Sequence, residues 1–418
     1  MAKQKIGAGR ASKGLGVFRD HEMNWVFKRT LTYMSEKAAE IGDCLYAARN
    51  IDEKDPESWI ETWAQLGARV DRQAQESLNT GDRISAREGF LRASNYYRTA
   101  EYGCTPSHPR FHELWEKSVA TFRRACPLFE SPVEAVEIPF DGYMLPGYFW
   151  QPDKTGKPRP TFMAVGGNDS SGEEIFMSTG PGAVRRGYNY FTFEYPGHRG
   201  SVHLNPDCVK RPDYEIPFAA AFDFLQQLPG VDERIALAGF SFGGYVVSRV
   251  AIHEPRIKAL IPDSAIIDLP GLVTGGFFAP LIKGVPRPLL DKILAMRLKR
   301  APMVRALMEY SLWTWGFSSF SEELDSETFN ACVIRDDLHR INCPTLALVG
   351  EDEGEMMIRQ VQDFIEGISS KEKQMRILSM SEDGSVDHCQ LDNIARAQQV
   401  MFPWLDRIFD HSNPSHSR

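Results

Sequence analysis

The chain has 418 residues, of which 42% are hydrophobic and 25% charged, and its formal net charge is -8. This balance is typical of globular proteins and excludes a largely disordered or fibrous chain, while the acidic charge argues against binding to nucleic acid, which requires a basic surface. The length predicts two to three domains.

The N-terminal residues 1–19 are basic and rich in glycine, and they lack the apolar stretch of a signal peptide, so we expect a flexible tail. No uncharged apolar run approaches the roughly 18 residues that span a bilayer, which predicts a protein that does not cross a membrane. The seven cysteines are scattered without CxxC spacing, a pattern that favours reduced thiols over zinc or redox sites. These features predict a cytoplasmic protein.

Residues 20–131 have the apolar spacing of helices. One helix is expected from Met34 to Ala48, where apolar residues at spacings of three and four form a single buried stripe. Another begins after Asp55, whose carboxylate can accept hydrogen bonds from the first turn, and a third ends near Ala100. We expect an N-terminal all-helical domain that acts either as a cap folded over the rest of the chain or as a homodimer interface.

The pattern of residues 132–410 predicts a domain of the α/β fold class. Asp141-Gly142 can supply the positive φ of a hairpin turn between two strands. Beyond it, short apolar runs alternate with helical stretches, which is the pattern of a mostly parallel sheet with helices on both faces. These runs are Thr161 to Val165, Tyr190 to Phe193, Ile235 to Ala238, Ala259 to Ile261, Thr345 to Val349 and Met375 to Leu378. Residues 411–418 are expected to form a tail.

About eighty residues separate the run that ends at Ile261 from the one that begins at Thr345, far more than a crossover helix needs. We therefore expect a helical lid inserted at about residues 265–338. Its aromatic side chains either pack among the lid helices or line a substrate pocket. The candidates for the pocket are Phe277, Trp313 and Trp315.

The sharpest chemical signal is a GxSxG motif centred on Ser241. An apolar run from Ile235 precedes it and a helical pattern follows, which is the strand-to-helix context of a nucleophile elbow. A serine on such a sharp turn has a strained backbone, and only small residues at Gly239 and Gly243 let the chain pass so closely. The N-terminus of the following helix favours developing negative charge. Ser241 is therefore the predicted nucleophile.

A serine hydroxyl needs a base, and in enzymes with this elbow the chain order is serine, acid, histidine. His388 is the only histidine placed after the last expected strand and before the C-terminal tail. The acid should follow the strand that ends at Val349. Spacing favours Glu353 and residue type favours Asp352, so the choice stays open. His198 follows an earlier strand, which predicts a structural or pocket-lining role.

The negative charge that develops on a substrate carbonyl needs two backbone N–H donors. One is expected from Phe242, the residue after the nucleophile, and the other from a loop after an earlier strand, where Gly167 or Asn168 fits. Neither a phosphate loop of the form GxxxxGKS or GxxxxGKT nor an HExxH zinc motif is present. We therefore expect neither a cofactor nor a metal.

These motifs together resemble the α/β-hydrolase superfamily. More narrowly, a helical N-terminal third followed by GGNDSSGEE at 166–174 and GFSFGGY at 239–245 is similar to the subgroup that holds 2,6-dihydropseudooxynicotine hydrolase, the fungal chain-shortening hydrolases of melanin heptaketide and related polyketide-pathway enzymes. The segments 38–42 and 55–59 also resemble hydrolases of secondary-metabolite clusters. The resemblance implies a helical domain that covers the active site and a substrate with a carbonyl beside a cleavable C–C bond. Glu353 stands where the superfamily pattern usually has an aspartate.

The expected function is that of a serine hydrolase acting on a small-molecule acyl or polyketide-like substrate such as a 1,3-diketone. In this hypothesis Ser241 attacks the carbonyl while His388 takes its proton, and water then releases the acyl-enzyme. Two other interpretations stay open. One is a carboxylesterase or acyltransferase on a small aromatic or lipid-like ester, and the other is a non-catalytic binding protein that keeps the elbow as a scaffold.

Overall fold

The computed structural model describes residues 16–275 and 279–411, and the chain divides into two compact units. Within the described residues, the helical unit comprises 16–135 and 292–313. The sheet unit comprises 136–291 and 314–411. Residues 292–313, which the sequence placed in the expected lid, thus belong with the N-terminal helices.

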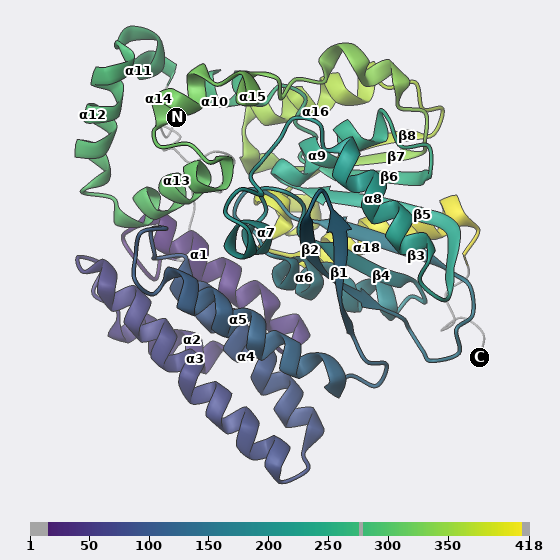
Figure 1. Cartoon of the computed structure of the whole chain (residues 1–418), viewed down its shortest axis with the longest axis horizontal. Coiled ribbons are helices and arrows are strands. Elements are labelled where there is room, and N and C mark those ends of the chain that lie inside the picture. The colour runs from purple at the N-terminus through teal and green to yellow at the C-terminus, as the bar shows by residue number, and fades with distance from the viewer. Residues whose placement is uncertain (1–15, 276–278, 412–418) are drawn as a thin grey trace. The chain divides into compact units, whose positions relative to one another are not determined.

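Helices of the helical unit begin at caps that the sequence supplies. The bounds are α1 His21–Thr32, η1 Tyr33–Glu36, α2 Ile41–Asn50, α3 Pro56–Asn79, α4 Arg83–Glu101, α5 Phe111–Ala125 and η2 Cys126–Leu128. The Asp55 carboxylate accepts the Glu57 N–H at the start of α3, and Asp82 accepts the Ser85 N–H at the start of α4. Helix α4 packs along both α3 and α5 (Figure 1).

The prediction of a single helix over residues 34–48 is wrong. Lys37 adopts a left-handed conformation, with φ 63° and ψ 18°, and ends η1 before α2 begins. The expected stripe breaks there as well, because Ile41 is 55% exposed whereas Cys44 is buried. The buried residues of α2 are Cys44 and Ala47, and neither belongs to the expected stripe.

Aromatic side chains fill the core of the helical unit. Trp59 and Trp63 on α3 are fully buried, with ring centroids 5.8 Å apart. The later segment contributes Trp313, whose ring meets Phe111 of α5 edge-on at 5.1 Å. Helices far apart in the chain therefore share one core here, and each helix buries the apolar face that it cannot satisfy alone.

The sheet unit is built on eight strands. Their bounds are β1 Glu134–Phe140, β2 Tyr143–Trp150, β3 Arg159–Val165, β4 Asn189–Phe193, β5 Val231–Phe240, β6 Ile257–Asp263, β7 Thr345–Gly350 and β8 Lys373–Leu378. The spatial order is β1-β2-β4-β3-β5-β6-β7-β8, with β2 antiparallel to β4 and the neighbours from β4 to β8 parallel. Asp141 and Gly142 both have positive φ, as predicted for the β1–β2 hairpin. The predicted fold class is confirmed.

Helices cover both faces of this sheet. Their bounds are α6 Gly172–Val184, α7 Arg199–Leu204, α8 Glu215–Gln226, α9 Phe242–Ala251, α16 Glu355–Gly367, α17 Met380–Asp383 and α18 Ile394–Phe409. Helices α8 and α9 pack together on one face, and α18 packs with α6 on the other (Figure 1). The central strands are consequently buried on both sides, and every residue from Phe162 to Val165 is fully buried. This explains why β3 appears in the sequence as a continuous apolar run.

The chain between β6 and β7 is helical. Its elements are α10 Leu269–Gly275, α11 Ala279–Gly284, α12 Arg287–Leu298, α13 Pro302–Trp315, α14 Phe320–Asp325, α15 Glu327–Asn330 and η3 Arg335–Arg340, and short turns η4 Glu351–Glu353 and η5 His388–Gln390 follow β7 and α17. The boundary between the two units falls twice in this insertion, near residues 291 and 314. The insertion therefore supplies helices to both units.

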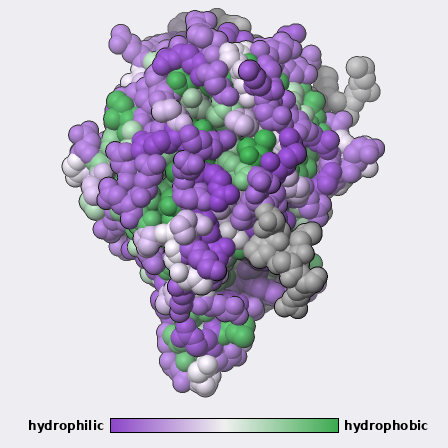
Figure 2. All heavy atoms as spheres, turned by 90° about the vertical axis from the view of Figure 1, so that its right-hand side faces the viewer, coloured by the Kyte–Doolittle hydropathy of each residue, from purple (hydrophilic) through white to green (hydrophobic). Residues whose placement is uncertain are grey.

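The face drawn in Figure 2 carries mostly hydrophilic residues, with hydrophobic ones in small separate groups. Across residues 16–275 and 279–411, no helix is both long and apolar enough to cross a membrane.

Candidate active site

Ser241 occupies the sharp turn between β5 and α9. Its φ of 61° and ψ of -124° lie in a region that costs a non-glycine residue about 1–3 kcal/mol. A Cβ on Gly239 would lie 2.2 Å from the Gly243 oxygen, and one on Gly243 would lie 2.5 Å from the Gly166 oxygen. Glycine is therefore required at both positions, which is the physical content of the GxSxG motif. The side chain of Ser241 remains partly exposed.

His388 lies between this serine and a carboxylate. The distance from His388 Nε2 to Ser241 Oγ is 2.7 Å, and from Nδ1 to Glu353 Oε2 it is 2.6 Å. Because a carboxylate only accepts, Nδ1 carries a proton that it donates to Glu353, and Nε2 accepts the serine hydroxyl proton. The structure thus brings together three of the side chains that the sequence singled out.

The acidic turn after β7 presents Glu353, rather than Asp352, to the histidine. Glu353 has a fully buried side chain, and it accepts hydrogen bonds from Ser264 Oγ at 2.6 Å and from the Gly350 N–H at 2.8 Å. Asp352 is partly exposed and donates its backbone N–H to Val386 O. Two fixed donors therefore hold the Glu353 carboxylate in place and leave an oxygen lone pair for the imidazole.

The charge of Glu353 affects the titration of His388. Burial lowers the pKa of His388, but charge interactions with Cys389 and Glu353 outweigh it, and the pKa lies well above its ordinary value. Burial also raises the pKa of the Cys389 thiol to about 12. That thiol is uncharged near neutral pH, so we attribute the raised pKa of His388 to the Glu353 carboxylate. The neutral imidazole, which is the form that can accept a proton, becomes more populated as pH rises.

A second carboxyl group, Asp263, lies buried at the end of β6. Its backbone oxygen accepts the Ser241 N–H at 2.9 Å, and its Oδ1 accepts from Gln390 Nε2 at 3.4 Å. Burial, and after it the negative charge of Glu353, raise the pKa of Asp263 to about 8. The group is therefore mostly protonated at neutral pH. No motif in the sequence indicated Asp263, although a polar residue at the carboxyl end of a central parallel strand is a usable signal.

The loop 166–171, which connects β3 to α6, passes directly beside the nucleophile. A Cβ on Gly167 would lie 2.6 Å from the Ser241 Cβ, so only glycine fits there. The Gly167 N–H donates to Ser170 Oγ at 2.8 Å, which turns it toward its own loop. Asn168 follows, and its Oδ1 accepts a hydrogen bond from Lys210. Phe242 is the first residue of α9, where a backbone N–H has no partner within the helix.

His198 lies beneath this loop. It is 1% exposed, its Nε2 is 3.3 Å from Ser170 Oγ, and its Nδ1 is 3.3 Å from Glu194 Oε2. Burial opposes the ionisation of Glu194, but the charges of His198 and Arg199 prevail and lower the pKa of Glu194 to about 2. Of the two roles left open by the sequence, this burial fits the structural one, since His198 braces the loop 166–171 from inside the sheet unit.

The two described aromatic candidates for the pocket, Trp313 and Trp315, pack in different units. Trp315 is 5% exposed and packs edge-on against Phe242 at 6.0 Å between ring centroids. Trp313, two residues earlier, packs in the helical unit against Phe111. Phe277 lies outside the described residues. Of the three aromatic pocket candidates, the structure thus brings Trp315 next to the nucleophile turn.

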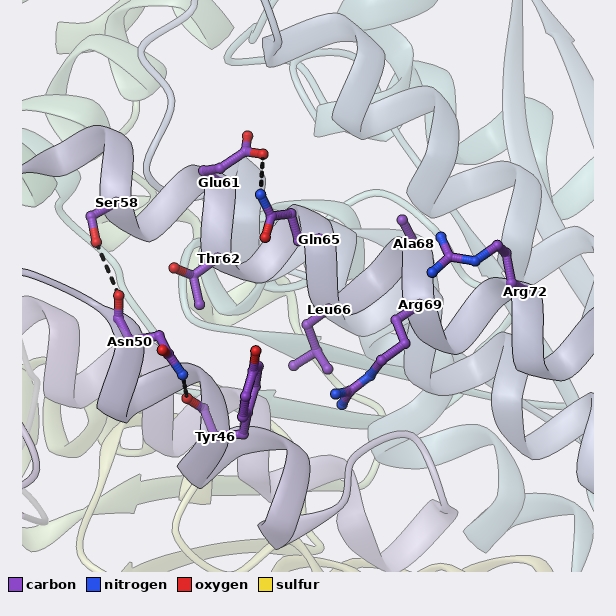
Figure 3. A pocket seen from close by; sticks show the side chains of 10 residues that line it. All are labelled: Tyr46, Asn50, Ser58, Glu61, Thr62, Gln65, Leu66, Ala68, Arg69 and Arg72. Carbon is purple, nitrogen blue, oxygen red and sulfur yellow. Dashed lines mark hydrogen bonds between the residues drawn. The ribbon is translucent and has the colours of Figure 1, made fainter.

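A surface pocket of about 600 Å³ lies between α2 and α3 of the helical unit (Figure 3). Its lining is mostly polar, and the side chains bond to one another, as in the hydrogen bond from Gln65 to Glu61. The lining residues are Tyr46, Asn50, Ser58, Glu61, Thr62, Gln65, Leu66, Ala68, Arg69 and Arg72. None of them is a candidate from the sequence. In the part of the chain that the structure describes, no group of three or more His, Cys, Asp or Glu is arranged to hold a metal ion.

A mostly parallel sheet with a serine on a strained strand-to-helix turn defines an α/β hydrolase. The chain matches the FrsA-like esterase family over residues 39–319, and the protein belongs to this family. The family membership agrees with the predicted superfamily and with the prediction of an enzyme.

Relatives and solved structures extend the likeness to most of the chain. The hydrolyase poxO of Penicillium oxalicum is 29% identical over 93% of this chain and 98% of its own length. The 20-hydroxy-prefusarin hydrolase FUS2 of Gibberella moniliformis is 29% identical over 94% and 98%. The crystal structure of 2,6-dihydroxy-pseudo-oxynicotine hydrolase has a TM-score of 0.70 at 23% identity, covering 91% of this chain and 97% of that one. At 23% identity, the likeness to this solved structure shows a shared fold.

Proposed function

We propose that this protein is a serine hydrolase that works through an acyl-enzyme. The observation that carries the proposal is the line of hydrogen bonds from Glu353 through His388 to Ser241, with heavy-atom distances of 2.6 and 2.7 Å. The line ends at a partly exposed serine on a strained turn. A carboxylate, imidazole and hydroxyl in this order activate a nucleophile on unrelated folds, so the geometry itself supports the role.

Each residue has a separate task in this mechanism. His388 Nε2 takes the hydroxyl proton as Ser241 Oγ attacks the substrate carbonyl, and Glu353 stabilises the imidazolium that forms. The backbone N–H groups of Phe242 and Asn168 stabilise the negative oxygen of the tetrahedral intermediate. Its collapse expels the leaving group, which receives the proton from His388. Water then attacks the acyl-enzyme with His388 again as the base.

For the substrate we propose a 1,3-diketone of polyketide type, in which the bond broken joins two carbon atoms. The relative named as a 20-hydroxy-prefusarin hydrolase supports this choice. An ester is the second candidate, favoured by the esterase name of the family, and acyl transfer to an alcohol follows the same steps. The ring of Trp315 beside Phe242 suits a planar, unsaturated substrate.

A fluorophosphonate probe, which bonds to an activated serine, tests the proposal when the intact mass is measured. We expect one adduct on the wild-type protein, none on Ser241→Ala, and labelling slowed by about 10³-fold or more in His388→Ala. Asp352→Asn is the matched control, since it changes the neighbouring carboxylate, and it should be labelled at the wild-type rate. An adduct that persists in Ser241→Ala, or none on the wild type, contradicts the proposal.

The cytoplasmic location, the homodimer and the independence from cofactors stay predictions. Light scattering on the purified chain measures its mass in solution. The mass of two chains supports a homodimer interface, and the mass of one chain supports a cap.

A further inference from the structure

Lys210 is a buried cation that no sequence motif indicated. It lies between α7 and α8 and is 3% exposed. Its Nζ donates to Asn168 Oδ1 and, at 2.7 Å, to Thr314 Oγ1, while its backbone N–H donates to Thr314 O at 2.9 Å. Two of the three ammonium protons are thus used. The third has no hydrogen-bond partner among residues 16–275 and 279–411.

The surroundings of Lys210 are those of the proposed oxyanion site. The ammonium lies 5.2 Å from the ring centroids of both Phe242 and Trp315, close enough for a modest attraction between the cation and the rings. Phe242 and Asn168 are the two residues whose backbone N–H groups we assign to the negative oxygen. Lys210 therefore contacts the side chains of both.

The charges of Glu323 and Asp169 act on Lys210, but neither carboxylate contacts its ammonium directly within the described residues. Cys332 is the third acidic group that acts on it. Burial lowers the pKa of Lys210 to about 7, so an anion bound beside the ammonium would favour its protonated form. Because a buried ammonium without a partner is costly, this position favours an anion that arrives with the substrate.

We propose that Lys210 binds the enolate oxygen released when the enzyme cleaves a 1,3-diketone, and so selects such substrates over esters. The inference rests on the proposed function of Ser241. In the step, Ser241 Oγ bonds to one carbonyl carbon, the bond from that carbon to the central carbon breaks, and its electron pair moves onto the second carbonyl oxygen. His388 then protonates the enolate on carbon, and water hydrolyses the acyl-enzyme.

Two negative oxygens develop in turn during this reaction, and the site has donors for both. The first is the oxygen of the attacked carbonyl, which the N–H groups of Phe242 and Asn168 stabilise. The second carbonyl of a 1,3-diketone is separated from the first by a single carbon, and in the proposed complex its oxygen accepts from Lys210, which contacts the side chains of Asn168 and Phe242. The leaving group of a simple ester has no such oxygen, and its cleavage gains little from this cation.

The first test measures which form of the diketone is bound. Benzoylacetone is added to Ser241→Ala, which cannot cleave it, at about pH 7, near the pKa of Lys210, and the enol and enolate are told apart by their ultraviolet absorbance. We expect the enolate on Ser241→Ala, its loss on Ser241→Ala/Lys210→Met, and its retention on Ser241→Ala/Lys258→Met, which replaces an exposed lysine of β6. Enolate of equal intensity without Lys210, or none with it, overturns the proposal.

The second test separates Lys210 from the nucleophile. Lys210→Met also loses the hydrogen bond to Asn168, so ester hydrolysis should fall as well, but benzoylacetone hydrolysis should fall at least about 30-fold further than the hydrolysis of p-nitrophenyl butyrate. Lys210→Arg keeps the charge and should recover part of that loss. An equal loss for the ester and the diketone assigns Lys210 a purely structural role and overturns the proposal. Failure of the wild-type protein to react with the fluorophosphonate overturns the proposed function instead.

Discussion

The sheet unit contains two rows built from the same three side-chain types, a glutamate, a histidine and a serine. The first row is Glu353, His388 and Ser241, and the second is Glu194, His198 and Ser170. In the first row the histidine lies 2.6 and 2.7 Å from its partners, and in the second both distances are 3.3 Å. Both histidines thus lie between a buried carboxylate and a hydroxyl, so the kinds of residue present do not distinguish the rows.

The backbone and the access to solvent do distinguish them. Ser241 lies on a strained turn, with φ 61°, and is partly exposed. Ser170 is 8% exposed, and its Oγ already accepts the Gly167 N–H. The first row ends at a hydroxyl that a substrate can reach, whereas the second ends inside a loop that it holds in shape. A carboxylate–histidine–serine row is therefore a sign of catalysis only together with an exposed, fixed nucleophile.

Replacing each serine by alanine should give the largest contrast between the rows. Ser241→Ala removes the nucleophile and should lower kcat by about 10⁶-fold. Ser170→Ala removes one acceptor of a loop N–H and should cost no more than about tenfold. Hydrolysis of p-nitrophenyl butyrate measures both. Losses of similar size would mean that the second row takes part in the chemistry.

Neutralising the carboxylate of the first row should have the next largest effect. Glu353→Gln should lower kcat by about 10⁴-fold, because the imidazolium loses its charged partner. The Glu353 charge raises the pKa of His388, so its removal lowers that pKa and moves the acid limb of kcat/KM to lower pH. Asp352→Asn should leave the profile unchanged. Wild-type activity in Glu353→Gln would mean that another carboxyl group acts as the acid, and Asp263, whose pKa responds to the charge of His388, is the candidate.

The second row should matter more for stability than for reactivity. His198→Ala leaves Glu194 buried without one of its positive partners and should lower the free energy of unfolding by about 3 kcal/mol. His388→Ala should lower it by less, about 1 kcal/mol, because Ser264 and the Gly350 N–H still donate to Glu353 and water can enter the space of the partly exposed imidazole. The pKa of Glu194 is lowered from 4.5 to about 2, so the stabilisation by this row is present above about pH 4.5 and is lost as pH falls toward 2. Urea unfolding near neutral pH compares the two variants. Equal destabilisation would remove the distinction between a catalytic row and a structural one.

Much of the first row could be predicted because its signals are local or ordered along the chain. The strand, Ser241 and the following helix are contiguous, and His388 follows from the order of elements. The choice between Asp352 and Glu353 could not be made, since it depends on which side of η4 faces Ser264 and the Gly350 N–H. The hydrogen bond from Ser264 to Glu353 joins residues about ninety positions apart, so the local pattern of the acidic turn does not indicate it.

Other features built from segments far apart in the chain could not be predicted either, because contacts between such segments leave no local pattern. Trp313 and Trp315 are two residues apart, yet one packs in the helical unit and the other beside Phe242, and composition alone cannot assign them. The side chain of Lys210 donates to Asn168 and Thr314, which lie 42 residues before it and 104 residues after it, so no local pattern indicates its role. The one helix predicted wrongly failed at Lys37, whose left-handed backbone has no signature in apolar spacing.

Asp263 should show the smallest effect and the one most specific to pH. Its pKa, raised from 3.8 to about 8 by burial and then by Glu353, means that the folded protein keeps a proton that the unfolded chain has lost. The resulting stabilisation is complete below about pH 3.8 and disappears as pH rises through about 8. Asp263→Asn cannot ionise, so it should react with the fluorophosphonate at nearly the wild-type rate at neutral pH, and its melting temperature should fall less than that of wild type between about pH 5 and 9. If the variant reacts far more slowly at neutral pH while its melting curve follows that of wild type, Asp263 is ionised in the folded protein and belongs to the first row as a second charged partner of His388.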